Sequence, residues 1–299
     1  MKIIVAGGTG LVGSHLIPML MEKGHEIVVL TTQTKPAARP FRQQHWDPTK
    51  NTLSKEILSG TDVVINLAGF SIANRWTSEN KQRMINSRVQ STQTLVAAFD
   101  AADQSVGLWI GASASGYYVP GDSPRVETDG SADDFLGKLT AAWESCNTTI
   151  GRKAQRQLIM RIPVVLAKED GALKQMLPLY RFGLGAPVGT GQQKMTWIHV
   201  DDLARFIVYA IETPSVSGVY NVSSPDVVTN KEFSAKLAKA LHRPHFLPTV
   251  PAWALRMLYG EMATLVLQGR NLNNTKLRQS GFQLQYPQLE LSLQHLLAQ

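Results

Sequence analysis

The chain has 299 residues, of which 43% are hydrophobic and 18% are charged, and its 30 Lys and Arg against 23 Asp and Glu give a net charge of +7. This balance is typical of a globular protein with a sizeable core, and it excludes a disordered, collagen-like or coiled-coil chain. The basic residues form no dense run and no apolar run approaches the roughly 18 residues of a membrane span, so we expect neither a nucleic-acid partner nor a membrane.

The first thirty residues predict a strand, a glycine-rich turn, a helix and a second strand. Residues 2–6 (KIIVA) and 26–30 (EIVVL) are short apolar runs, typical of strands buried on both faces of a sheet. Between them, apolar residues recur at helical spacing from Leu11 up to Gly24, a natural helix stop. A strand, a helix and a strand in this order pair their strands in parallel.

The same alternation continues along the first half of the chain. We predict further strands over 62–67, 106–110 and 158–162, and helices over 78–99 and 135–150. Strands separated by helices of this length indicate an α/β fold, namely a doubly wound parallel sheet with helices on both faces.

The character of the sequence changes after about residue 165, where Gly and Pro become frequent. Beyond it we predict a loop-rich segment over 171–191 and a mostly helical end over 251–297. Between them we expect helices over 200–212 and 230–241, with a strand over 218–222. We therefore expect a nucleotide-binding domain over 1–165. A substrate-binding lobe with a C-terminal extension would occupy 166–299, partly interleaved with the first domain.

Glycines at positions 7, 10 and 13 follow the first strand and open the first helix. Small residues are needed there because the turn is tight, the backbone must touch a pyrophosphate and the helix must start close to the sheet. The phosphates then bind free N–H groups at the helix start, where the helix dipole favours anions. The turn predicts a dinucleotide cofactor.

The end of the second strand indicates which dinucleotide binds. An NAD site usually places Asp or Glu about twenty residues past the turn, where it binds the ribose hydroxyls. Here Thr31 and Thr32 stand in that region, no carboxylate follows, and Lys35 and Arg39 lie just beyond. These residues favour a 2′-phosphate and hence NADP(H), with Thr32 and Lys35 beside it.

Three motifs, GGTGLVG at 7–13, NLAG at 66–69 and WIHVDD at 197–202, resemble those of the extended short-chain dehydrogenase/reductases, the NAD(P)-dependent epimerases and dehydratases of nucleotide sugars. Longer strings resemble a subgroup labelled "epimerase family protein" more closely: RWTSENKQRMINSR at 75–88, SASGYY at 113–118, LGAPVGTGQQKMTWIHVDDLA at 184–204 and VPAWALRMLYGEMATLVLQGR at 250–270. The last string is similar to that subgroup's own C-terminal extension.

The resemblance implies a Rossmann domain with a smaller substrate lobe, and NADP(H) as the cofactor. Carried over by position, the pyrophosphate would lie against six residues of the turn: Gly7, Thr9, Gly10, Leu11, Val12 and Gly13. Leu67, Ala68 and Gly69 would line the adenine-ribose side of the cofactor.

Enzymes of this superfamily use a Tyr and a Lys four residues apart on one helix, together with a Ser at a strand end. The Lys cation and the nicotinamide charge lower the pKa of the Tyr, so that its oxygen can exchange a proton with a substrate hydroxyl. Ser113 matches the serine. No Tyr-x-x-x-Lys pair matches the helix, because the residue four before Lys138 is Asp134.

Aligning the same helix on Glu144 places Leu136 and Thr140 in the paired positions, and neither can do this chemistry. Tyr117 and Tyr118 remain as proton donors on the loop after Ser113, with Lys138 as a cation. The alternative for the two tyrosines is packing beside the sheet edge.

Arg88 falls on the same face of the helix over 78–99 as its apolar residues, at a position where the enzymes that this chain resembles carry Asn. An arginine directed at the sheet cannot lose its proton and must find an anion. An internal carboxylate such as Asp202 or Glu144 would be a structural partner. The other partners are a cofactor phosphate or an anionic substrate, and we favour a bound ligand.

Two further residue types carry no chemistry in this interpretation. We interpret His199, in WIHVDD, as a hydrogen-bonded structural residue, and the seven histidines have no metal-binding spacing, so we expect no metal. The one cysteine, Cys146, excludes an intrachain disulfide.

Only a few apolar residues precede the first glycine, too few for a signal peptide, so we expect a cytoplasmic protein.

These observations predict an NADP-dependent oxidoreductase or epimerase that acts on an unidentified small molecule, for which Arg88 indicates an anionic group. We expect a monomer or a homodimer. The alternative is an NADP(H)-binding regulatory protein with little catalysis. The absent Tyr and Lys pair favours it, and some members of the subgroup that the chain resembles influence cell or organelle division.

Overall fold

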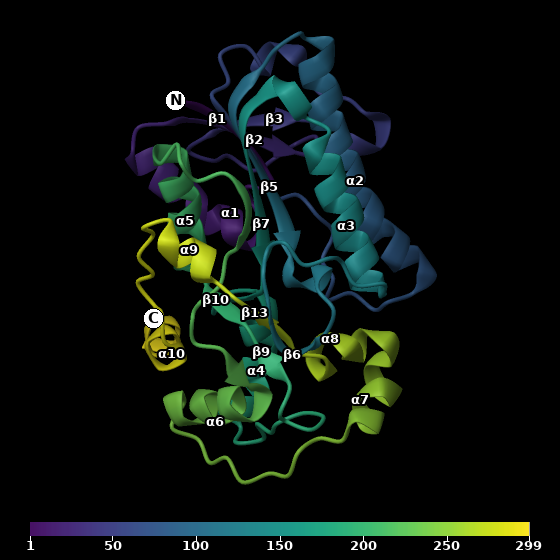
Figure 1. Ribbon diagram of the computed structural model, residues 1–299, viewed down its shortest axis with the longest axis vertical. Helices are drawn as coiled ribbons and strands as arrows, with labels where there is room; N and C mark the ends of the chain where they lie inside the picture. The colour runs from purple at the N-terminus through teal and green to yellow at the C-terminus, as the bar shows by residue number, and fades with distance from the viewer. Residues whose placement is uncertain (299) are drawn as a thin grey trace.

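The main sheet of the computed structural model, which describes residues 1–298, has seven parallel strands in the order β11-β7-β5-β4-β1-β2-β3 (Figure 1). In chain order they are β1 Lys2–Ala6, β2 Glu26–Thr31, β3 Arg42–His45, β4 Val63–Asn66, β5 Val106–Ala114, β7 Ala154–Ile162 and β11 Gly218–Asn221. The predicted doubly wound parallel sheet is confirmed. The strand order reverses between β1 and β4, and ligands of open parallel sheets bind at such a point, at the carboxyl ends of the strands.

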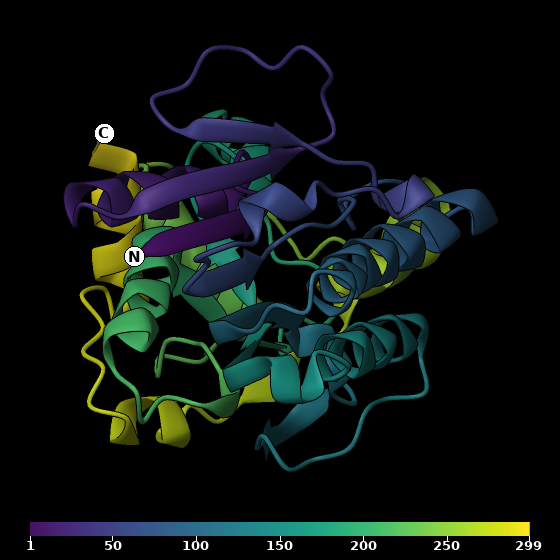
Figure 2. The ribbon, with the colours of Figure 1, turned by 90° about the horizontal axis from the view of Figure 1, so that it is seen from above.

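Helices cover both faces of this sheet. Figure 2 shows α1 (Leu11–Glu22) and α5 (Val200–Glu212) on one side of it, and α2 (Ser78–Ala101) and α3 (Phe135–Thr148) on the other. Successive strand residues enter opposite cores: Ile3 and Val5 pack with the side chains of α1 and α5, whereas Ile4 and Ala6 pack with those of α2. The prediction that these continuous apolar runs form strands buried on both faces of the sheet is therefore confirmed.

One connection differs from the expected alternation. No α-helix follows β2; the chain crosses an exposed loop to β3 and continues through the short 3-10 helices η1 (Pro48–Lys50) and η2 (Lys55–Ile57) to β4. The residues of β3, RQQH, contain no apolar side chain, so periodicity could not predict this strand. A polar edge strand of this kind limits unwanted pairing with other chains.

The smaller lobe is built from short strands and three helices that share a separate core. Its four-stranded sheet has the order β12-β9-β13-β6 and a second pair is β10-β8. The strands are β6 Gly121–Arg125, β8 Val164–Leu166, β9 Lys194–Met195, β10 Trp197–His199, β12 Val228–Thr229 and β13 Arg270–Leu272, and the helices are α4 Gly171–Arg181, α6 Asn230–Ala240 and α10 Leu289–Ala298.

The segment 171–191, expected to be loop-rich, contains α4, and this expectation was wrong for its first eleven residues. Asp170 caps the helix by accepting a hydrogen bond from the Gly171 N–H, and Leu173 and Leu177 are buried at helical spacing. The predicted boundary near residue 165 stays a prediction. The main sheet takes its last strand, β11, and the helix α5 from beyond that boundary.

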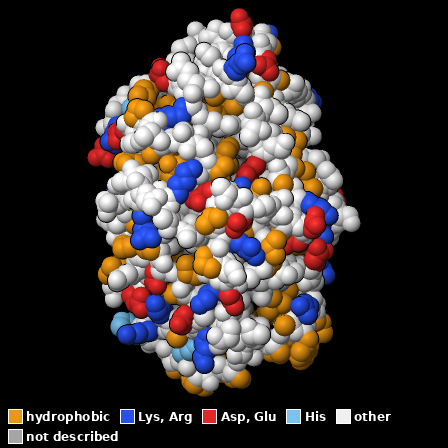
Figure 3. All heavy atoms as spheres, viewed as in Figure 1, with side chains coloured by type: hydrophobic (Ala, Val, Ile, Leu, Met, Phe, Trp, Pro, Cys, Tyr) orange, Lys and Arg blue, Asp and Glu red, His pale blue; other side chains and the backbone are white. Residues whose placement is uncertain are grey.

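The C-terminal segment is mostly helical, as expected, and β13 interrupts it. It contains α7 Ala252–Tyr259, η5 Gly260–Ala263, α8 Thr264–Leu267 and α9 Thr275–Gln279, besides α10. None of the residues of α7 is buried, and Trp253, Met257 and Leu258 are exposed. Figure 3 shows hydrophobic side chains at the lower right, where Figure 1 places α7. Within residues 1–298 no helix combines the length and the hydropathy of a membrane span.

Arg156 of β7 caps the C-terminal end of α5 with hydrogen bonds. Its Nη1 donates to the carbonyl oxygens of Ala210 (2.7 Å), Thr213 (2.9 Å) and Val216 (2.8 Å). The last carbonyls of a helix have no partner within the helix, so a cation placed here satisfies them and also interacts favourably with the helix dipole.

We expect Arg156→Met to lower the free energy of unfolding by about 2 kcal/mol, because a charged donor to several carbonyls is lost. The measurement is the urea midpoint at constant m-value. Arg152→Met, at an exposed position in the nearby 3-10 helix η4 (Gly151–Lys153), is the control and should change the midpoint little. Equal effects of the two substitutions would contradict this assignment.

Candidate functional site

The glycine turn between β1 and α1 has no room for side chains on the side of the sheet. Gly7 has a φ of +78°, and a Cβ atom there would lie 2.7 Å from the carbonyl carbon of Leu67. A Cβ atom on Gly13 would lie 2.4 Å from the backbone oxygen of Gly8. The turn is therefore held close to both the sheet and the segment after β4, as a pyrophosphate-binding turn requires.

The start of α1 offers unpaired donors to an anion. Its N-cap residue, Gly10, has no side chain to accept the first helical N–H groups, and the first turn carries no acidic residue. Thr9 and Gly10 are exposed. These N–H groups and the helix dipole favour a phosphate at this position.

The segment after β4 lies beside this turn. The Leu67 N–H donates to the carbonyl of Ala6 (2.9 Å), and the Ala68 N–H donates to Oδ1 of Asn66 (3.2 Å). The structure therefore brings Leu67 and Ala68 together with the glycine turn, at the carboxyl ends of β1 and β4. Thr32 and Lys35 are exposed in the loop after the neighbouring β2.

Ser113, Arg161 and Asn221 form a row across the carboxyl ends of three strands. The register pairs Ser113 of β5 with Arg161 of β7, and Arg161 with Asn221 of β11. Paired residues of parallel strands point to the same face. This face carries α3, from which Glu144 reaches the row.

Glu144 connects Ser113 to Arg161. Ser113 Oγ donates to Oε1 of Glu144 (2.5 Å), while Arg161 donates from Nε to the same oxygen (2.8 Å) and from Nη2 to Oε2 (2.9 Å). Burial lowers the pKa of Arg161, but the hydrogen bonds and charge of Glu144 outweigh this effect and raise it above its usual value. The result is a bidentate ion pair behind a serine hydroxyl.

The two tyrosines after β5 have different surroundings. The hydroxyl of Tyr118 is fully buried, accepts a hydrogen bond from Nη1 of Arg161 (2.7 Å) and donates to Oδ1 of Asn221 (2.7 Å). Desolvation raises the pKa of Tyr118 to about 12, although Arg161 opposes the shift. Tyr117, in the 3-10 helix η3 (Ser115–Tyr117), is partly exposed, and the Arg161 guanidinium lies 3.6 Å from its ring centroid. Tyr118 has the environment of a structural residue, and Tyr117 that of an accessible one.

The structure does not bring Lys138 to Ser113. Lys138 is exposed on α3, and none of its hydrogen bonds or ion pairs within residues 1–298 reaches the row of polar residues. The two alternative positions also lack the chemistry of a Tyr and Lys pair. Leu136 is buried, and the Thr140 hydroxyl donates to backbone carbonyls of its own helix at 2.7 and 3.1 Å.

The C-terminal segment supports the loop of the tyrosines through Arg270. From β13 this side chain donates to the Tyr118 carbonyl (2.8 Å) and to the carboxylate of Asp134 (2.9 Å), the N-cap residue of α3. Sequence reasoning missed the roles of Arg161 and Arg270. An arginine within the apolar run LIMRI was the available signal, because a charge in a buried strand needs a partner.

Neither internal carboxylate proposed for Arg88 is its partner. Glu144 pairs with Arg161, and Asp202 pairs with Arg205 at 2.8 Å. Arg88 donates from Nη1 to the carbonyls of Phe70 and Met84 instead, at 2.9 Å each.

His199 is fully buried and uses both ring nitrogens for hydrogen bonds. Its Nδ1 accepts the Asp201 N–H (3.0 Å) and its Nε2 lies 3.1 Å from Nδ1 of His295. Burial lowers the pKa of His199 to about 4, so the ring is neutral at pH 7. Donor atoms of His199, Asp201 and His295 lie within 4.8 Å of one another, as a metal site would require. The hydrogen bonds of His199 favour a structural network, and the absence of a metal stays a prediction.

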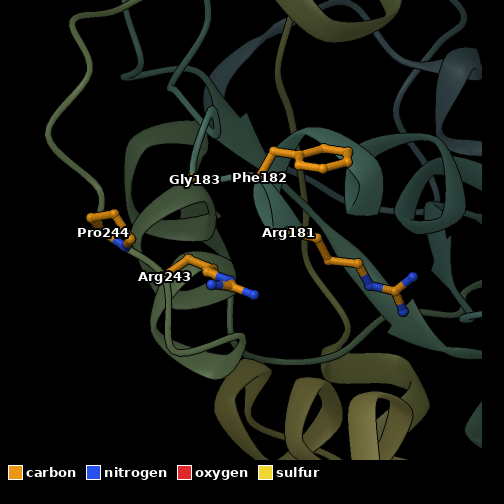
Figure 4. Close-up of a pocket in the computed structure, with 5 residues that line it drawn as sticks. All are labelled: Arg181, Phe182, Gly183, Arg243 and Pro244. Carbon is orange, nitrogen blue, oxygen red and sulfur yellow. The ribbon is translucent and has the colours of Figure 1, made fainter.

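Two surface hollows lie elsewhere. One, of about 520 Å³, is lined by residues from the end of α4 and from the segment after α6: Arg181, Phe182, Gly183, Arg243 and Pro244 (Figure 4). The other, of about 710 Å³, lies between α1, α5 and the segment around Phe282. Neither is lined by a residue of the glycine turn or of the Ser113 row.

Residues 3–223 match the NAD dependent epimerase/dehydratase family, and residues 250–296 match a domain of unknown function, DUF1731. The chain belongs to the NAD-dependent epimerase/dehydratase family. "Epimerase family protein SDR39U1" of Mus musculus is 34% identical over 304 residues, with 100% of both chains covered. "Epimerase family protein YfhF" of Bacillus subtilis is 35% identical over 300 residues, covering 100% of this chain and 98% of its own. The resemblance to this subgroup is confirmed.

Solved structures agree with the fold. The crystal structure of human epimerase family protein SDR39U1 (isoform 2) with NADPH has a TM-score of 0.88 and 31% identity, covering 99% of both chains. UDP-N-acetylglucosamine 4-epimerase from Bacillus cereus has a TM-score of 0.73 at 17% identity, covering 99% of this chain and 98% of its own. The second likeness is one of fold alone.

We expect Arg161→Met to lower the free energy of unfolding by about 3–5 kcal/mol, because it leaves a mostly buried carboxylate without its counter-charge. Urea unfolding measures the loss. The double variant Arg161→Met with Glu144→Met should recover part of it, since no unpaired charge then remains. A loss below about 1 kcal/mol would show that the pair is not buried in solution.

Proposed function

We propose that this protein is an NADP-dependent oxidoreductase or epimerase of the extended short-chain dehydrogenase/reductase type, which acts on a small anionic molecule. The uncapped start of α1 behind the glycine turn is the observation that carries this proposal. It lies at the carboxyl edge of the sheet, the edge that also carries Ser113. The NADPH in the human relative supports the choice of cofactor.

The glycine turn fits a dinucleotide, because any Cβ atom at Gly7 or Gly13 would meet the backbone. The residues that would hold the pyrophosphate are Gly7, Thr9, Gly10, Leu11, Val12 and Gly13, and those that would line the adenine ribose are Leu67, Ala68 and Gly69. Thr32 and Lys35 would face the 2′-phosphate. Neither Lys35 nor its neighbour Arg39 has an ion pair within residues 1–298, so both cations are available to a phosphate.

When bound, the nicotinamide ring of this cofactor accepts or returns a hydride. The Ser113 hydroxyl donates its hydrogen bond to Glu144, so its oxygen can accept a hydrogen bond from a substrate hydroxyl. A proton that leaves this hydroxyl can pass through Ser113 to the Glu144 carboxylate, which Arg161 holds in place. Tyr117 is the second group that can donate to a substrate, because its hydroxyl makes no hydrogen bond within residues 1–298.

Proton transfer is therefore assigned to Ser113 and Tyr117. Tyr118 and Lys138 receive no such role, since the hydroxyl of Tyr118 is enclosed by Arg161 and Asn221 and Lys138 is exposed on α3. The Leu136 and Thr140 positions favour a second candidate function, an NADP(H)-binding regulatory protein with little catalysis. Turnover measurements separate the two functions.

NADPH should bind at least about tenfold more tightly than NADH, because a charge-assisted contact to the 2′-phosphate contributes about 1.5–3 kcal/mol to binding, or roughly tenfold and more. Fluorescence titration of the two cofactors measures the ratio. Lys35→Ala should reduce the ratio of the two dissociation constants. Lys174→Ala should leave this ratio unchanged, because Lys174 is an exposed residue of α4. Gly10→Val should remove binding of both cofactors by filling the space before the turn. Equal affinities for NADPH and NADH would refute the choice of cofactor.

Ser113→Ala should lower kcat by about 10²–10⁴-fold, the usual contribution of a positioned acid–base group, with the NADPH dissociation constant unchanged. Lys138→Ala should lower kcat much less. The assay is NADPH oxidation with a carbonyl compound found by screening a panel of keto acids and sugar phosphates. Loss of all turnover in Lys138→Ala, with NADPH binding intact, would overturn the assignment.

A further inference from the structure

Arg88 is a partly exposed cation of α2 whose guanidinium has unused donors. Nη1 is fixed by the carbonyls of Phe70 and Met84, both at 2.9 Å. Nε is buried and has no hydrogen-bond acceptor within residues 1–298, and Nη2 donates to none of these residues either. A buried N–H group without an acceptor lowers the stability of the folded protein, unless a ligand supplies the acceptor.

The charge of Arg88 is also uncompensated. No carboxylate of the described chain lies within 4.0 Å of its nitrogen atoms. Burial lowers its pKa to about 10, so the side chain stays protonated at pH 7. Two buried arginines differ in that respect: Arg161 pairs with Glu144 and Arg270 with Asp134.

The surroundings of Arg88 leave one edge of its guanidinium without a hydrogen-bond acceptor. A Cβ atom on Gly69 would lie 3.0 Å from Cζ and 3.2 Å from Nε and Nη2, which places this glycine against the flat face of the group. The Trp143 ring lies 4.9 Å from Cζ. With Nη1 used by carbonyls, the edge formed by Nε and Nη2 remains, and this edge has the spacing that binds two oxygens of a carboxylate or phosphate.

We propose that the Nε and Nη2 edge of Arg88 binds an oxyanion of the substrate, a carboxylate or a phosphate, in a bidentate manner. This inference rests on the proposed function, since it names the substrate class of that site. Arg88 lies on the α2 and α3 side of the sheet, where Trp143 contacts it and the next residue, Glu144, holds Ser113. The pyrophosphate has its own donors at the start of α1, on the opposite side of the sheet.

The test uses inorganic phosphate and malonate as probes, each compared with sodium chloride of equal ionic strength. Melting temperatures are measured for the wild type, Arg88→Gln and Arg88→Lys, with and without saturating NADPH. We expect one probe to stabilise the wild type saturably, with a dissociation constant at least tenfold higher in Arg88→Gln. Arg88→Lys keeps the charge but loses the two-pronged edge, so it should recover only part of the affinity.

Arg152→Gln is the control, because Arg152 is an exposed cation in η4 and its loss changes the net charge equally. It should leave the probe affinity unchanged. The proposal is overturned if neither probe stabilises the wild type beyond chloride, or if Arg88→Gln responds as the wild type does. It is also overturned if Arg88→Gln loses NADPH binding, because the anion would then belong to the cofactor. Failure of the wild type to bind NADPH would refute the proposed function alone, since the probe arm without cofactor still reports on Arg88.

Discussion

An arginine keeps its proton at physiological pH, so every guanidinium that folding encloses needs oxygen atoms to accept its hydrogen bonds. Arg156 and Arg161, five residues apart on β7, point to opposite faces of the main sheet and meet this need in different ways. Arg156 fixes the end of α5 on one face, and Arg161 fixes Glu144 of α3 on the other. Arg270 adds the C-terminal segment to the same edge. The position of Ser113 depends on these contacts. Arg88 does not meet the same need, because its Nε and Nη2 groups have no acceptor within residues 1–298.

Much of the sheet could be predicted from the sequence, because its signals are local. The bounds expected for the first strand, over 2–6, and for the helix over 200–212 agree with β1 and α5, since an apolar run and an apolar stripe mark them clearly. The strands of the smaller lobe have two to five residues, too few to show a period of two. Their positions come from hydrogen bonds to distant segments, as when β13 pairs with β6.

The candidate site divides in the same way. The glycine turn and Ser113 are local features, predictable from a strand and the residues that follow it. The Arg161 network joins residues up to 103 positions apart, as in the bond from Tyr118 to Asn221. It depends on the order of β5, β7 and β11 in the sheet, which the sequence alone does not specify. For the same reason the sequence could not distinguish Tyr117 from Tyr118 as a proton donor. In the structure Tyr118 is buried and Tyr117 is partly exposed.

The late arrival of β11 has a consequence for synthesis on the ribosome. Glu144 and Arg161 are translated before Asn221, which follows Arg161 by 60 residues, or roughly 3–12 s at about 5–20 residues per second. During that interval Arg161 can already bind its carboxylate, but β7 has a free edge where β11 will later pair. An unpaired apolar strand edge is a template for wrong pairing between nascent chains. The pairing of β11 therefore protects an edge of β7 that stays open to wrong pairing throughout this interval.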